Sequence, residues 1–311
     1  MPKSIEILMA TYNGSAYLKE QIDSILNQDY SFLRLIIRDD ASTDDTPKIL
    51  QEYMQKFPDK ITVLPSHKRL GVKENFSCLM SHSQANYVMF ADQDDFWLPN
   101  KIRITFEMMQ QMELKYGKEI PLLIHTDLKV VDENLNLIAD SFWKYANLFP
   151  KTSHSLNRLL GQNVVTGCTV LMNRSLVELA SPIPSETLMH DWWLALNAAA
   201  FGQIGYVQES TILYRQHGKN TLGAQKFCSK TWLINGEKKS LYNQLSYKKR
   251  NQVIVLFSHS KPLFNDYQKN MLIAYIDLHK NTFFKKRYLI LKYQFFKNGF
   301  FRNCAQLIMP D

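Results

Sequence analysis

Long apolar runs and paired cysteines are both missing from this chain of 311 residues. No stretch of about 18 apolar residues occurs, so the sequence predicts no membrane-spanning helix. The apolar stretch near the N-terminus turns polar at Thr11, too soon for the core of a signal peptide. The four cysteines stand far apart without a CxxC pair, which argues against a disulfide framework or a zinc site. We therefore expect a cytoplasmic protein.

Glycine-rich loops are also missing. Neither the GxGxxG pattern of dinucleotide-binding enzymes nor the GxxxxGKS/T pattern of P-loop enzymes occurs, and Gly71 and Gly167 are isolated. The GxSxG elbow of α/β-hydrolases is absent as well. These absences argue against three common enzyme classes. The content of 45% hydrophobic and 21% charged residues is that of an ordinary globular protein with a sizeable core.

Charge is distributed unevenly along the chain. The formal net charge of +8 comes from 37 Lys and Arg against 29 Asp and Glu. Residues 226–311 hold 16 basic and 4 acidic residues, a net charge of +12, whereas residues 1–225 hold 21 and 25, a net charge of −4. The basic excess, which would suggest a polyanionic partner, therefore belongs to the tail. We expect a functional boundary near residue 225.

Strands and helices alternate over the first hundred residues, which predicts an α/β fold with a parallel sheet and right-handed crossovers. The expected strands are 5–10, 33–37, 61–64 and 87–91, and the expected helices are 17–26, 43–54, 74–82 and 99–114. Farther along, strands are expected at 122–131, 163–172 and 212–215, and helices at 175–180 and 189–199. The tail has helical spacing at 237–256, 266–279 and 283–308.

Acidic residues follow two of these strands, at the edge where parallel sheets bind ligands. Asp92, Asp94 and Asp95 lie within four residues, and ionising such close carboxylates is costly without a cation. Mg²⁺ is commonly held by one or two carboxylates together with substrate phosphates. The cluster therefore predicts a metal–diphosphate site, the alternative being a solvated acidic turn. Of Asp39 and Asp40, one can cap a helix and the other can accept the imide N–H of uracil or thymine, unless both are caps.

Two single residues are weaker candidates when taken alone. Asp191 lies beside Trp192 and Trp193, and partial desolvation by aromatic neighbours favours a general base. The alternative is a helix N-terminal acid stabilised by the helix dipole. His217 follows a strand, and most such histidines are structural or solvated rather than metal ligands.

Several strings together resemble a family 2 glycosyltransferase. Residues 7–14 (ILMATYNG), 21–28 (QIDSILNQ) and 38–44 (RDDASTD) look like the start of that family, and residues 90–101 (FADQDDFWLPNK) match its metal-binding motif. Residues 126–131, 189–192 and 213–217 resemble a narrower group, the bacterial rhamnosyltransferases that build rhamnose-containing cell-wall polysaccharides. The resemblance covers about residues 4–225 closely.

The resemblance implies a GT-A fold, with a mostly parallel sheet flanked by helices, and inversion at the anomeric carbon. It implies a nucleotide-sugar donor and Mn²⁺ or Mg²⁺. The matching nucleotide-sugar-binding residues are Thr11, Tyr12, Asn13, Asp40, Asp92 and Asp94, with Asp94 and Asp92 also at the metal. Asp191 matches the catalytic base, and His217 matches a histidine that completes the metal site and favours Mn²⁺ somewhat. Ala41 stands where many relatives have glycine, and we expect no functional effect from it.

The narrower resemblance makes dTDP-L-rhamnose the expected donor and a lipid-linked saccharide the expected acceptor. UDP-glucose and UDP-galactose stay open as donors. The expected organisation is a catalytic domain at 1–225, with its nucleotide-sugar part at about 1–115 and its acceptor part at about 116–225, followed by a basic helical extension at 226–311.

The tail at 226–311 interleaves aromatic and basic residues, above all in residues 283–297. Such a helix can lie in a membrane interface with its cations near anionic headgroups, which predicts peripheral contact with the inner face of the cell membrane. Alternatively, its apolar side packs on the catalytic domain. A nucleic-acid-binding protein is a further alternative. We expect no nucleic acid partner, because the acidic strand ends would repel phosphates unless a metal were bound.

Overall fold

The structure is a computed structural model, and it describes residues 3–66, 68–218, 223, 224, 226 and 236–308. The boundary expected near residue 225 falls at a residue outside this description. Among the described residues, no helix has both the length and the apolar character needed to cross a membrane.

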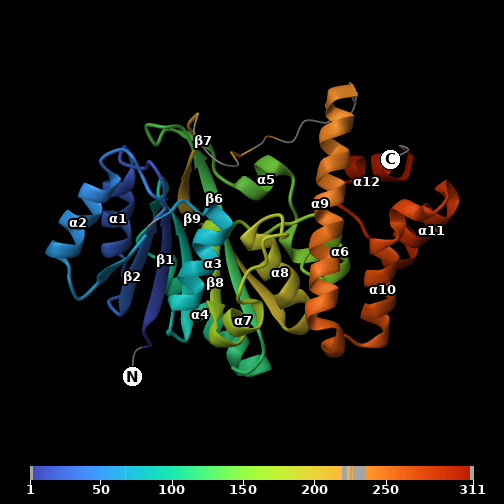
Figure 1. Ribbon diagram of the computed structural model, residues 1–311, viewed down its shortest axis with the longest axis horizontal. Helices are drawn as coiled ribbons and strands as arrows, with labels where there is room; N and C mark the ends of the chain where they lie inside the picture. Colours follow the sequence, from blue (N-terminus) through green and yellow to red (C-terminus); the bar gives the residue numbers. More distant parts are fainter. Residues whose placement is uncertain (1–2, 67, 219–222, 225, 227–235, 309–311) are drawn as a thin grey trace.

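A nine-stranded sheet forms the centre of the protein (Figure 1). Its first four strands are parallel, in the order β3 (Ile61–Leu64), β2 (Leu33–Asp39), β1 (Ile5–Thr11) and β4 (Tyr87–Asp92). The second half is mixed. β8 (Leu171–Asn173) runs antiparallel between β4 and β6 (Leu122–Val131), and β9 (Gln203–Arg215) runs parallel to β6. The short strands β5 (Phe96–Trp97) and β7 (Leu137–Ala139) pair with β9 and β6.

Helices cover both faces of this sheet. Alternate residues of β1 point to opposite faces, so Ile5, Ile7 and Met9 join one core while Leu8 joins the other. The helices α1 (Leu18–Leu26), α2 (Thr46–Lys56) and α4 (Lys101–Tyr116) pack on the first face. On the second face pack α3 (Val72–His82), α6 (Leu156–Gly161), α7 (Arg174–Ala180) and α8 (His190–Phe201). The predicted α/β architecture is confirmed.

Three expected elements differ from the structure. The expected strand at 163–172 is reduced to β8, because the side chain of Asn163 bonds both backbone groups of Val165 and a 3₁₀ turn follows at Gly167–Thr169. The expected strand at 212–215 is only the end of β9, which begins at Gln203. The expected helix at 283–308 is broken into α11 (Phe283–Tyr293) and α12 (Phe300–Ile308), because Gln294 and Gly299 adopt left-handed backbone angles.

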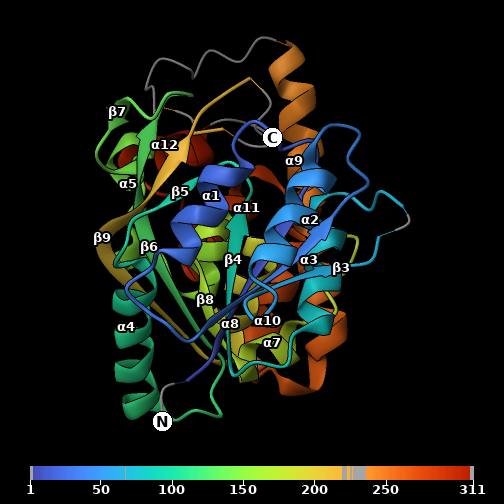
Figure 2. The same ribbon diagram turned by 90° about the vertical axis from the view of Figure 1, so that its left-hand side faces the viewer.

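The basic tail packs against the catalytic part of the chain. α9 (Gly236–Ser260) and α10 (Asp266–Ile276) stand beside α8 and α6, and α11 and α12 lie beyond them at one end of the molecule (Figure 1). Viewed from the opposite end, α9 and α10 lie largely behind α2 and α3, whereas α12 lies near α5 (Figure 2). Val253, Leu256, Leu272 and Phe295 are buried in the same core as α8. Packing of the tail on the domain is therefore a fact of the structure, while the expected membrane contact remains a prediction.

Candidate active site

Three neighbouring strand ends bring polar side chains to one edge of the sheet. In the parallel register, Thr11 of β1 lies opposite Asp39 of β2, and Ala10 lies opposite Asp92 of β4. The hydroxyl of Thr11 donates to Asp39 over 2.9 Å. The edge predicted from the strand pattern is therefore formed, and the two acidic segments meet there.

The short strand β5 positions the second half of the acidic cluster. Phe96 and Trp97 pair with Leu213 and Ile212 at the end of β9, so Asp94 and Asp95 lie next to the residues that follow this strand. Nε2 of His217 comes within 2.8 Å of Oδ2 of Asp94. Two predicted metal ligands that are far apart in the sequence are thus adjacent in space.

Tyr17 and Arg215 hold the neighbourhood of His217 in position. Its ring stacks on Tyr17 with 5.0 Å between ring centroids, and the guanidinium of Arg215 lies 4.5 Å from the centroid of the same tyrosine. Arg215 is buried and donates to the backbone oxygen of Asp94, to the backbone oxygen of Glu133 and to the carboxylate of Glu20. These contacts hold the Asp94 backbone and the imidazole in place.

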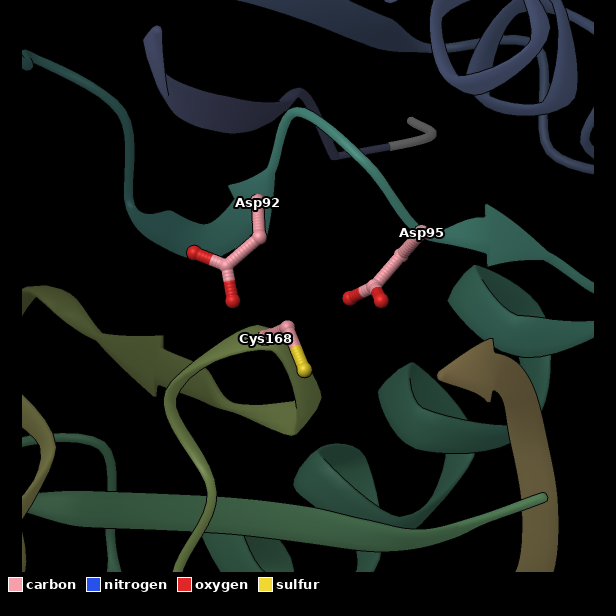
Figure 3. Close-up of side chains that lie close together, drawn as sticks. All are labelled: Asp92, Asp95 and Cys168. Carbon is pink, nitrogen blue, oxygen red and sulfur yellow. The ribbon is translucent and has the colours of Figure 1, made fainter. Parts of the chain in front are cut away.

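Asp92 and Asp95 face one another across the strand end, with Cys168 below them (Figure 3). Their potential ligand atoms all lie within 4.8 Å of one another. Burial, and then the neighbouring Asp94 and Asp191, raise the pKa of Asp92 to about 7. Burial also raises the pKa of the Asp95 carboxyl and of the Cys168 thiol well above their usual ranges. Cys168 therefore stays a protonated thiol and makes a poor metal ligand.

A buried lysine lies near this cluster. Lys101 has no exposed surface, and its Nζ lies 4.6 Å from the centroid of the Trp97 ring. Burial lowers the pKa of this lysine to about 8, and the nearby Cys168 and Asp95 oppose that shift. Lys101 thus places a buried positive charge near Asp95 and Cys168.

Asp191 lies in the first turn of α8, as the sequence predicted, and takes part in the same electrostatic cluster as Asp92. Burial raises the pKa of Asp191 to about 7, although its carboxylate accepts hydrogen bonds from the backbone N–H groups of Trp192 and Gly167. A Cβ atom on Gly167 would lie 2.6 Å from Nε2 of His190, so the chain can approach this closely only with glycine there. A carboxylate with a pKa near neutrality is suited to accept a proton in catalysis.

Four residues were expected to bind the nucleoside: Thr11, Tyr12, Asn13 and Asp40. In the structure, they also make hydrogen bonds within the protein. The backbone of Tyr12 exchanges two hydrogen bonds with the side chain of Gln93. Asn13 adopts a left-handed conformation, and its Oδ1 accepts the backbone N–H of Thr43. Thr11 is 1% exposed and Asp40 is 3% exposed. All four lie at the same sheet edge as the acidic cluster.

Asp40 is bound on both carboxylate oxygens. It accepts a hydrogen bond from Arg38 over 2.9 Å and from the backbone N–H groups of Leu70 and Gly71 over 2.7 Å each. Asp39, by contrast, accepts from the backbone and hydroxyl of Ser42, so it caps the turn before α2. A nucleobase would therefore compete with the chain's own donors for Asp40.

The chemistry of the donor set fits a divalent cation. Asp92 and Asp94 offer hard carboxylate oxygens, and His217 offers an imidazole nitrogen beside Asp94, a combination that suits Mn²⁺ and Mg²⁺. Burial, and then repulsion from Asp94 and Asp191, raise the pKa of Asp92, and a bound cation would offset the cost of ionising this carboxyl.

Sequence reasoning missed several residues of the site. Tyr17 and Glu20 lie outside the matching strings, and Lys101 ends the string at 90–101 but was given no role, because the roles of all three arise from tertiary contacts. Arg215 stands two residues before His217 in one of the matching strings, and Gly167 was noted only as isolated. Only Arg215 could have been found from its position, because no candidate residue stands near Gly167 in the sequence.

The fold is that of GT-A-type glycosyltransferases. The chain superposes on the crystal structure of S. aureus TarS 1-349 in complex with UDP-GlcNAc with a TM-score of 0.59 at 13% identity, covering 93% of this chain and 79% of that one. It superposes on the mannosyltransferase PcManGT from Pyrobaculum calidifontis, in complex with GDP-Man and Mn²⁺, with a TM-score of 0.55 at 14% identity, covering 94% and 74%.

The chain belongs to glycosyl transferase family 2, whose model matches residues 6–178. It is 30% identical over 229 residues to dTDP-rhamnosyl transferase RfbG of Shigella flexneri, covering 70% of this chain and 74% of that protein. It is also 25% identical over 243 residues to the putative teichuronic acid biosynthesis glycosyltransferase TuaG of Bacillus subtilis, covering 76% and 89%. The resemblance found in the motifs is confirmed, and the protein is a glycosyltransferase.

Proposed function

We propose that this glycosyltransferase transfers L-rhamnose from dTDP-L-rhamnose to a lipid-linked saccharide in the synthesis of a cell-surface polysaccharide, with inversion at the anomeric carbon. The similarity to a dTDP-rhamnosyl transferase supports the donor. The observation that carries the chemistry is the position of Asp191, a carboxylate with a pKa of about 7 in the same cluster as Asp92.

In this proposal, Asp191 accepts the proton of the acceptor hydroxyl as that oxygen attacks the anomeric carbon. The attack comes from the face opposite the nucleoside diphosphate, so a β-L donor gives an α-L linkage. The ionised form of Asp191 is the active one.

Asp94, Asp92 and His217 would hold a divalent cation, which as a Lewis acid neutralises charge on the diphosphate leaving group. Arg215 and Tyr17 keep His217 and the Asp94 backbone in position. Two hydrogen bonds between the side chain of Gln93 and the backbone of Tyr12 hold the end of β1 against the acidic segment at residues 92–95. These bonds support the part of the site at which the nucleoside would bind.

The test is a donor screen with the purified full chain and Mn²⁺, measuring release of nucleoside diphosphate from dTDP-L-rhamnose, UDP-glucose and UDP-galactose. We expect turnover of dTDP-L-rhamnose above that of the UDP-hexoses, and loss of turnover with a chelator. Preferential turnover of a UDP-hexose would overturn the rhamnose assignment. Turnover unaffected by chelation would overturn the metal assignment.

A further inference from the structure

The histidine that precedes Asp191 is held by two aromatic rings. His190 begins α8 and is 4% exposed. The centroid of its ring lies 4.4 Å from that of Phe76 in α3 and 5.4 Å from that of Phe90 in β4. The two phenylalanine rings stack on one another with 4.5 Å between centroids. Because these contacts join α8 to α3 and to β4, the imidazole has little freedom to move.

The Nε2 corner of this imidazole points at Gly167. A Cβ atom at Gly167 would lie 2.6 Å from Nε2 of His190 and 3.5 Å from each of the two ring carbons beside it. The backbone N–H of the same glycine donates to the carboxylate of Asp191. His190 therefore lies against Gly167, and Gly167 in turn holds the carboxylate of the proposed base.

The aromatic packing alone does not require a histidine at position 190. Its Nδ1 is buried and has no hydrogen-bond partner among the described residues, a cost in free energy that a phenyl ring would avoid. A six-membered ring, however, would extend farther toward Gly167, which already lies against Nε2. Burial lowers the pKa of His190 to about 3, so the ring is neutral and adds no positive charge beside Asp191. The imidazole is thus the aromatic side chain that fits this gap.

The same contacts relate the base to the strand that carries the acidic cluster. Phe90 lies in β4, and β4 ends at Asp92. A ring that is fixed on Phe90 and lies against Gly167 sets the position of the Asp191 carboxylate relative to that strand. Reacting groups must be closely aligned, so a shift of Gly167 would slow transfer even where the donor still binds.

We propose that His190 is a positioning residue for the base: its ring, fixed by Phe76 and Phe90, holds Gly167 where the glycine N–H orients the carboxylate of Asp191. This inference rests on the proposed function for the role of Asp191. His190 acts through Asp191 and takes no proton itself.

The experiment measures kcat, KM and donor affinity with dTDP-L-rhamnose and Mn²⁺ for the wild type, His190→Ala, Asp191→Asn and the double variant. Loss of the ring frees Gly167, so we expect His190→Ala to lower kcat by about 10–10²-fold with the dissociation constant of the donor unchanged. In the Asp191→Asn background the same change should lower the rate by less than about twofold, because no base is left to be misplaced. Fully additive losses, or a loss of donor affinity in place of kcat, would overturn the proposal.

A second pair of substitutions tests the contact with Gly167. This glycine has no positive φ, and the three nearest atoms that a Cβ would meet all belong to the ring of His190. Gly167→Ala alone should therefore lower kcat. Adding His190→Ala should restore part of it, because the new methyl group can occupy space that the ring has left. A double variant no faster than Gly167→Ala would contradict the proposed contact.

Two further variants separate position from stability. His190→Phe keeps an aromatic ring on Phe76 and Phe90 and removes the unpaired nitrogen, yet it should lower kcat because the larger ring displaces Gly167. It also replaces His190→Ala in the Asp191→Asn comparison if the alanine variant does not fold. The control Met109→Ala removes a buried side chain from the core on the other face of the sheet, so it should lower the melting temperature and keep kcat. Wild-type kcat in His190→Phe, or an equal loss of kcat in Met109→Ala, would refute the positioning role.

The two proposals fail separately. If Asp191→Asn keeps the turnover of the wild type, the proposed base is wrong whatever the His190 variants do. If Asp191→Asn loses turnover while His190→Ala and His190→Phe keep it, Asp191 remains the base and only the role of His190 is removed.

Discussion

Replacement of Asp191 by asparagine is the perturbation that reports most on the site. Asparagine keeps the size of the side chain and an oxygen that can accept the N–H groups of Trp192 and Gly167, so the start of α8 should be retained. It cannot accept a proton. A positioned general base contributes about 10²–10⁴-fold to the rate, which corresponds to roughly 3–5 kcal/mol of activation free energy. We expect Asp191→Asn to lose turnover in this range while donor binding survives.

The same substitution should stabilise the folded protein. The pKa of Asp191 rises on folding from 3.8 to about 7, so the unfolded chain releases this proton at lower pH than the folded chain does. Stability is therefore lost as the pH rises from about 4 to 7, and the loss persists at higher pH. A pKa difference of this size sets an upper limit of about 4 kcal/mol, which residual solvent contact reduces. The asparagine side chain avoids this cost, so we expect a melting temperature a few degrees higher at pH 8 and little difference at pH 4.

The assays are steady-state transfer, donor calorimetry and thermal unfolding, each over a range of pH. Wild-type turnover should rise with pH through about 7, because the ionised carboxylate of Asp191 is the proposed base. The exposed Glu186, on the loop before α8, gives the control Glu186→Gln, which should match the wild type. Turnover of Asp191→Asn within a fewfold of the wild type, with the fold intact, would remove Asp191 from the role of base.

Three further predictions concern the strand ends. Asp94→Ala should abolish metal-dependent donor binding in calorimetry, because the cation would lose the carboxylate ligand that lies beside His217. An unchanged affinity would contradict the metal assignment. Ala41→Gly should raise the free energy of unfolding by about 0.5–1 kcal/mol in denaturant titrations, since Ala41 has a φ of 62°, and a decrease would refute this. Gly14→Ala should lower it by roughly 1–3 kcal/mol and weaken nucleotide binding, because the new Cβ would lie 2.2 Å from Oε1 of Gln93; a variant as stable as the wild type would refute it.

The elements predicted well from sequence are those whose own residues determine them. β1, β2 and β4 are mostly apolar, with charged interior residues only at Glu6 in β1 and at Arg34 and Arg38 in β2. The helices between them have one apolar stripe each, so the period and the length of the apolar pattern were enough to predict these elements. β5 was not predictable in this way. It has two residues and exists only because β9 passes beside it. The first part of β9 was missed because Gln203, Gly205 and Gln208 interrupt its apolar pattern.

The same distinction between local sequence and tertiary contacts applies to the residues of the candidate site. The acidic residues were found because they follow strands at the edge where ligands bind, and the structure brings Asp94 and His217 together as the family motifs imply. The supports were not found, because Tyr17 acts by stacking and Lys101 by burial near Asp95. Neither contact is encoded in local sequence.

The tail shows what a charge count can and cannot give. The count located the basic region correctly, but it could not tell a solvated cation from a buried one. In the structure, the exposed Lys285 and the half-buried Lys286 are neighbours on α11 with different surroundings. Burial, rather than the net charge of +12, therefore decides how each cation of the tail behaves.

Inverting transfer with Asp191 as the proposed base can be tested by the anomeric configuration of the first product. Proton NMR during turnover of dTDP-β-L-rhamnose with Mg²⁺, which does not broaden the signals, should show an α-L-rhamnoside forming in the wild type. The rate in Asp191→Asn should be lower by about 10²–10⁴-fold. A β-L-rhamnoside as the first product would contradict the account.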